Sequence, residues 1–118
     1  MLSEHAKKLF FNNNFVGQSV YLGLIDDTNS EVSAAEYERK SISWNNPSTS
    51  GNKVSITNDN KVEFDTAESD WGAIEKMAIF DSASGGNKLD EATLSSSVDV
   101  KTNYQFWIDS GGYKIELE

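Results

Sequence analysis

The pattern of apolar positions at the start of the chain is helical. Four apolar residues recur at helical spacing and share one face: Leu2, Ala6, Leu9 and Phe10. Ser3 suits the N-cap position ahead of them, and three asparagines at 12–14 favour a turn that ends the pattern. The sequence therefore predicts a short helix within residues 1–14, which needs tertiary packing to persist.

From residue 15 onward the pattern changes to the alternation typical of strands. Eight short alternating or apolar runs follow one another: 19–25, 40–44, 54–56, 62–64, 73–80, 89–94, 104–108 and 113–117. Turn residues separate the runs at the spacing of a sandwich or small barrel. We expect an all-β fold, a single antiparallel β-sandwich-like domain of about 7–8 short strands over residues 15–118.

Three hairpins are predicted, each from two runs around a turn: 54–56 with 62–64, 73–80 with 89–94, and 104–108 with 113–117. The turns between them are Asn58-Asp59-Asn60, Asp81–Asn87 and Ser110-Gly111-Gly112. Each turn is rich in asparagine, aspartate, serine or glycine, which are the residues that reverse a chain.

Composition narrows the range of partners. The chain has 118 residues, with 10 Lys plus Arg against 19 Asp plus Glu, a net charge of -9. Phosphate repels a chain this acidic, so we predict no direct contact with nucleic acid or with an anionic membrane. No apolar run is long enough to span a bilayer, and the N-terminus does not resemble a signal peptide. Assembly in the cytoplasm is therefore expected.

The residues for catalysis or metal binding are sparse. The chain has no cysteine, and its one histidine, His5, lies on the short terminal helix, so a nucleophile lacks an evident base. The acidic loops at 26–31 and 58–60 carry the oxygen ligands that Ca²⁺ uses, but neither matches an EF-hand and turn chemistry explains both. The sequence predicts a non-enzymatic protein without a cofactor or metal.

Aromatic residues leave two interpretations open. Seven could stack on sugars or fill the core: Trp44, Trp71, Trp107, Tyr21, Tyr37, Tyr104 and Tyr113. A carbohydrate-binding β-sandwich module would expose several of them along a shallow groove. A structural protein would bury them within or between subunits.

Two places on the chain are candidate protein interfaces. Phe106 and Trp107 are consecutive, so in a strand one of them points away from the main core. Leu9-Phe10-Phe11 covers more than one side of the predicted helix, so one side could contact a neighbouring subunit. The candidate interface residues are Leu2, Leu9, Phe10, Phe11, Phe106 and Trp107.

Four short stretches together resemble a known family. They are Tyr21-Leu22-Gly23-Leu24, Glu36-Tyr37-Glu38-Arg39, Asp70-Trp71-Gly72 and Ile79-Phe80-Asp81-Ser82-Ala83-Ser84-Gly85-Gly86-Asn87. Their order and spacing are similar to those of small bacteriophage virion structural proteins of the tail-fibre-like and head-decoration type. The residues that match the motifs are Gly23, Tyr37, Arg39, Trp71, Gly72, Phe80, Asp81, Gly85 and Gly86. Glu36 stands where that family usually has glycine.

The resemblance implies a virion component. We expect a homo-oligomer, most simply a homotrimer, bound to the major capsid protein or to a tail protein. The chain shows no fibrous shaft, repeat or long coiled coil, which favours capsid decoration. The alternative is a tail fibre or tail appendage that contacts the host, where a host glycan is a possible partner.

Overall fold

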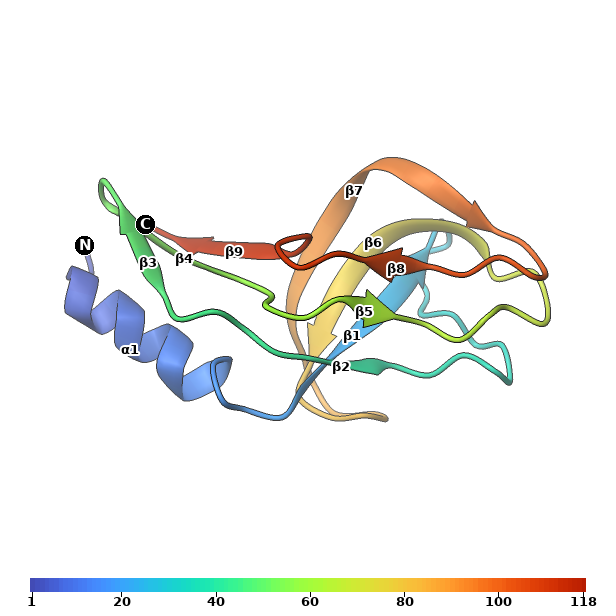
Figure 1. The fold of residues 1–118 in the computed structure, drawn as a ribbon, viewed down its shortest axis with the longest axis horizontal. Coiled ribbons are helices and arrows are strands. Elements are labelled where there is room, and N and C mark those ends of the chain that lie inside the picture. The colour runs from blue at the N-terminus through green and yellow to red at the C-terminus, as the bar shows by residue number, and fades with distance from the viewer.

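The computed structural model describes residues 1–118 as one helix and nine strands (Figure 1). The helix α1 spans Glu4–Asn14. The strands are β1 (Val20–Asp26), β2 (Lys40–Ile42), β3 (Ser48–Ser50), β4 (Lys53–Thr57), β5 (Val62–Glu63), β6 (Gly72–Phe80), β7 (Lys88–Val100), β8 (Trp107–Ile108) and β9 (Lys114–Leu117). The all-β prediction with a short N-terminal helix is confirmed.

The strands form three antiparallel sheets. The largest has the order β2-β1-β6-β7, and the smaller ones are β3-β4-β9 and β5-β8. Figure 1 shows the two smaller sheets in line along the length of the molecule, with β4 continuing towards β5 and β8 towards β9. Both chain ends lie at the α1 end of this long axis.

Most of the core is one apolar cluster of 20 buried residues drawn from all three sheets and from α1, and a smaller cluster of Ile25, Ala78 and Phe80 lies apart from it. Leu22 and Leu24 of β1 and Ile79 of β6 are completely buried in the larger cluster. On the smaller sheets, Val54 and Val62 contribute the apolar side of β4 and β5. The period-two alternation of these strands therefore places their apolar side chains between the sheets.

Two of the three predicted hairpins are wrong. The β6–β7 pair is a hairpin, but β4 pairs with β9 and β5 pairs with β8. The reason lies at Asn58, which is completely buried between the two pairs. Its side-chain amide donates to the Asp109 carbonyl at 3.0 Å, and its Oδ1 accepts from the Tyr113 backbone N–H at 2.8 Å. The asparagine that was predicted to close a local turn instead holds a segment 51–55 residues away.

The helix starts as predicted but turns a different side inward. The Ser3 hydroxyl accepts from the Ala6 N–H at 3.1 Å, which is an N-cap contact. Phe11 is completely buried, and Lys7 on the same side is buried with its Nζ donating to the Asn52 carbonyl at 2.5 Å. The predicted apolar face therefore lies outside: Leu9 and Phe10 are exposed. One large aromatic ring in the core outweighs several smaller contacts.

No helix in the chain has the length and apolarity required to cross a bilayer.

Candidate functional site

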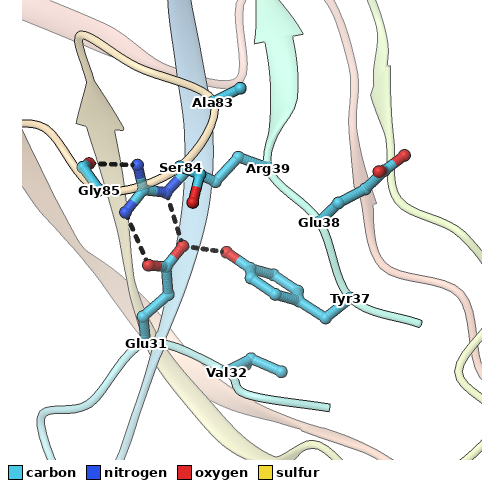
Figure 2. Close-up of a pocket in the computed structure, with 8 residues that line it drawn as sticks. All are labelled: Glu31, Val32, Tyr37, Glu38, Arg39, Ala83, Ser84 and Gly85. Carbon is cyan, nitrogen blue, oxygen red and sulfur yellow. Dashed lines mark hydrogen bonds and ion pairs between the residues drawn. The ribbon is translucent and has the colours of Figure 1, made fainter. Parts of the chain in front are cut away.

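Three polar side chains form a connected cluster beside β1. Arg39 donates to both carboxylate oxygens of Glu31, from Nε to Oε2 and from Nη2 to Oε1, each at 2.8 Å. Tyr37 donates its hydroxyl proton to Glu31 Oε2 at 2.7 Å, as Figure 2 shows. The two-pronged contact between guanidinium and carboxylate is the strongest ion-pair geometry available to proteins. The cluster therefore ties Glu31, at the start of the irregular segment before β2, to Tyr37 and Arg39 at its end.

Further contacts attach this cluster to its surroundings. The Leu24 backbone N–H donates to the Tyr37 hydroxyl at 3.0 Å, and the Tyr37 ring stacks on Phe64. Arg39 Nη1 donates to the carbonyls of Ser82 and Gly85, each at 2.8 Å (the Gly85 contact is drawn in Figure 2). Its guanidinium carbon also lies 3.6 Å from the centre of the Phe80 ring. Tyr37 therefore joins the segment before β2 to β1, and Arg39 joins it to β6 and the β6–β7 loop.

Gly23 leaves the space in which this cluster sits. A Cβ atom at this position would lie 2.7 Å from Phe80 Cε2, 2.9 Å from Glu31 Oε2 and 3.1 Å from the Tyr37 hydroxyl. The first two distances are too short for real atoms. Glycine in an apolar strand indicates a close approach or a bulge. Here it is a close approach, made by side chains rather than by another backbone.

The β6–β7 loop has the shape needed to reach Arg39. Asp81 Oδ1 accepts from the Asn87 backbone N–H at 2.8 Å, and Oδ2 accepts from the Asn87 side-chain amide at 3.1 Å. Gly85 and Gly86 have φ of 63° and 68°, in the left-handed region. A Cβ at Gly86 would collide with the Asp81 carboxylate. The motif residues of this loop therefore shape it so that its carbonyls point towards the guanidinium.

The tryptophan motif joins the same cluster. Trp71 is buried, its ring meets Tyr37 edge-on at 5.5 Å between centroids, and its Nε1–H donates to Glu36 Oε1 at 3.1 Å. Glu36 also accepts from the Glu68 backbone and the Ser69 hydroxyl. Gly72, with φ of 88°, starts β6 immediately afterwards. The Glu36 carboxylate therefore holds the tryptophan loop.

The ionisation of these groups follows from their contacts. A backbone hydrogen bond, followed by the bond from Trp71, lowers the pKa of Glu36 to about 2. Burial raises the pKa of Glu31, but hydrogen bonds from Arg39 and Tyr37 offset this, so that it lies below its usual value. Burial, together with Glu31, raises the pKa of Tyr37. At neutral pH the cluster is therefore a carboxylate, a guanidinium and a neutral phenol.

Every polar group in the cluster already has a partner. Glu31 accepts three hydrogen bonds and Arg39 donates four. The hollow beside them holds about 360 Å³ and is lined by Glu31, Val32, Tyr37, Glu38, Arg39, Ala83, Ser84 and Gly85 (Figure 2). Side chains whose polar atoms are all hydrogen-bonded to one another and to loop carbonyls hold the loops together. They do not present an activated nucleophile or base. The geometry is that of a structural brace.

The predicted interface residues divide into exposed and buried sets. Leu2, Leu9, Phe10 and Trp107 are exposed, each by between 44% and 51%. Phe11 and Phe106 lie in the core of this chain, so neither offers a surface to a partner. For Phe106 and Trp107, the strand alternation separates the two rings as expected. The exposed residues lie in two places, on α1 and on β8, far apart along the molecule (Figure 1).

The acidic loops are turns. Asp26 Oδ1 accepts from the Thr28 N–H, the Thr28 hydroxyl and the Ser30 N–H, which is the side-chain-closed turn that aspartate favours. No group of three or more histidine, cysteine, aspartate or glutamate side chains is placed to hold a metal ion.

Sequence reasoning missed the roles of Glu31, which accepts three hydrogen bonds from Tyr37 and Arg39, and of Asn58, which contacts a segment 51–55 residues away. Glu31 was grouped with a polar loop, and nothing local distinguished it. Asn58 was assigned to a turn because asparagine favours turns. The only available signal for Glu31 was the glycine in β1, which requires something to fill the space above it.

The chain matches the family model described as "Podophage GP4 fiber I protein gp80" over residues 19–116. Since the match covers most of the chain and all four motif stretches, the chain belongs to this family of phage fibre proteins. Membership supports the resemblance to tail-fibre-like proteins and implies a virion component. No curated protein matches, and no solved structure matches.

Proposed function

We propose that this chain is a non-enzymatic structural component of a phage tail fibre. The observation that carries the proposal is the fibre-family match over residues 19–116. The saturated Glu31–Tyr37–Arg39 cluster supports the non-enzymatic part, since its groups brace loops and leave none free for chemistry. The family name favours a fibre over the capsid decoration that the absence of a shaft suggested from the sequence.

We propose further that α1 attaches the domain to another virion protein. The helix precedes residue 19 and so lies outside the segment that matches the family. Phe11 and Lys7 fix it against the domain, which holds Leu9 and Phe10 in a constant outward direction. A fixed apolar surface loses little conformational entropy when a partner covers it.

One experiment tests both where the chain lies on the particle and whether α1 attaches it. Phage carrying Leu9→Ser and Phe10→Ser together are compared with phage carrying Leu89→Ser, which removes an equally exposed apolar side chain on β7. Immunogold labelling gives the position of the chain on the particle, and quantitative mass spectrometry gives its copy number. We expect label on the tail at low copy number, lost in the helix variant and retained in the control.

Two results would contradict these proposals. Label spread over the head at hundreds of copies would refute the fibre placement and favour capsid decoration. Full incorporation of the helix variant would refute attachment through α1. The homotrimer expected from the sequence stays a prediction, which sedimentation equilibrium of the purified chain tests directly.

A further inference from the structure

An uncharged groove lies between β7 and the segment that leads into β8. It has a volume of about 450 Å³ and is lined by Leu94, Ser95, Ser96, Val98, Gln105, Phe106, Trp107 and Ile108. None of these side chains carries a charge, although charged residues make up 25% of the chain and its net charge is -9. The groove is therefore a neutral region on an acidic molecule.

A bulge in β7 forms one wall of this groove. The register pairs Ile74 with Val98 and Lys76 with Thr93, so the four residues 94–97 of β7 lie opposite a single residue of β6. Extra residues lift a strand away from its partner and redirect its side chains. The hydroxyls of Ser95 and Ser96 are exposed as a result, and neither forms a hydrogen bond within the chain.

Trp107 forms the opposite wall and is held in place. It pairs with Glu63 in the short β5–β8 ladder, and Lys61 Nζ lies 4.3 Å from the centre of its ring. The indole is nevertheless 47% exposed. A large aromatic plane that is both rigid and exposed gives a ligand contact area at little entropic cost. The polar Gln105 lies beside it, where its Nε2 donates to the Phe64 carbonyl and leaves its amide oxygen to accept.

We propose that this groove binds a neutral saccharide. The C–H face of a sugar ring packs on an indole plane, and its hydroxyls pair with serine hydroxyls and an amide oxygen. The volume is within the range of about 300–1,000 Å³ that small-ligand sites occupy. The eight lining side chains carry no charge, which complements a neutral ligand. The net charge of -9 disfavours phosphorylated or carboxylated glycans, and the one cation beside the groove, Lys61, is already placed against the Trp107 ring. The inference rests on the groove alone and does not depend on where the chain sits in the virion.

The chain contains its own probe of this site. Trp44 and Trp71 are each only 5% exposed, so acrylamide quenching of tryptophan fluorescence reports Trp107. The purified full chain is titrated with maltohexaose, N-acetylchitohexaose and a galactomannan, and with dextran sulfate as an anionic comparison. We expect at least one neutral glycan to protect Trp107 saturably, with a Kd on the order of 1 mM, and dextran sulfate to give no protection.

Variants separate the site from the fold. Because Trp107→Ala removes the fluorescent probe, isothermal titration calorimetry measures the binding of each variant. We expect Trp107→Ala to weaken binding at least tenfold and Ser95→Ala several-fold, with urea unfolding little changed because both side chains are exposed. Tyr104→Ala is the matched control, an exposed aromatic outside the groove, and should bind like the unmodified chain.

Three outcomes would overturn the proposal. The first is no protection by any of the three neutral glycans at about 20 mM. The second is equal protection by dextran sulfate, which would contradict the neutral class of ligand. The third is protection of Trp107 that rises with protein concentration in the absence of sugar, which would show that a second copy of the chain occupies the groove.

Discussion

Replacing Gly23 by alanine tests whether the motif cluster braces the fold. Gly23 lies in β1, where an added Cβ would be 2.7 Å from the Phe80 ring and 2.9 Å from the Glu31 carboxylate. Neither the Phe80 ring nor the Glu31 carboxylate can move away without losing other contacts. The Phe80 ring has the Arg39 guanidinium over its face, and Glu31 is bound by Arg39 and Tyr37. The new methyl group must therefore strain the core or break the ion pair.

The expected loss can be estimated from its parts. Overpacking a dense core costs about 1–3 kcal/mol. Weakening one charge-assisted hydrogen bond in the cluster adds about 1.5–3 kcal/mol, whereas alanine gains about 0.5–1 kcal/mol over glycine in a strand. We expect the free energy of unfolding to fall by about 2–4 kcal/mol, a large fraction of the roughly 5–15 kcal/mol that domains possess.

Urea unfolding followed by circular dichroism measures this loss. Gly51→Ala is the control, since a Cβ there meets nothing within 4 Å and only its φ of 63° is unfavourable, at a cost of about 1 kcal/mol. A double-mutant cycle with Phe80→Leu removes the closest contact and should reduce the effect of Gly23→Ala by at least about 1 kcal/mol. A loss below about 0.5 kcal/mol, or an equal loss in both backgrounds, would refute the reasoning.

Three further predictions concern other contacts. The pKa of Glu36 is about 2 in the folded chain against an ordinary 4.5, so its stabilising contribution is present above pH 4.5 and is lost as the pH falls towards 2. The urea midpoint should therefore drop between pH 6 and pH 2.5, and drop less in Glu36→Gln; equal drops would contradict this. Asn58→Ala should lower the free energy of unfolding by about 3 kcal/mol or more, since it leaves the buried Tyr113 N–H without a hydrogen-bond acceptor. An Asn58→Ala chain as stable as the parent would be incompatible with that role. Phe11→Ala should lower the free energy of unfolding by about 3–5 kcal/mol and Phe10→Ala by under about 1 kcal/mol, because only Phe11 is fully buried. Urea unfolding measures both losses, and the reverse order would show that α1 packs by its other side.

The sequence predicted most strands well because alternation is a local signal. Leu22 and Leu24 lie two positions apart in an apolar run and face the same core, and strand alternation separates Phe106 from Trp107. The β6–β7 hairpin was also predictable, since its turn residues close on one another through Asp81 and Asn87. The N-cap at Ser3 belongs to the same class of short-range contact.

Longer-range pairing was not predictable from the same signals. The hairpin predicted around Asn58 and the terminal hairpin were wrong, because a turn-forming residue satisfies its hydrogen bonds equally well with a distant backbone. The inward side of α1 was also wrong, since the spacing of apolar residues does not say that Phe11 outweighs Leu9 and Phe10. The motif stretches suggested a common role, but Glu31, which binds both Tyr37 and Arg39, carried no distinguishing signal.

By itself the sequence determined the acidic surface, the all-β class with its short N-terminal helix and the resemblance to phage structural proteins. Each of these follows from residue type and spacing over a few positions. Only the tertiary structure decided which strands pair, which side of α1 is buried, and that Gly23 makes room for Phe80, Glu31 and Tyr37. The groove beside Trp107 is likewise tertiary, because a bulge in one strand and an exposed ring on another create it. Local periodicity constrains each segment, whereas the contacts between segments depend on packing that is set across the whole chain.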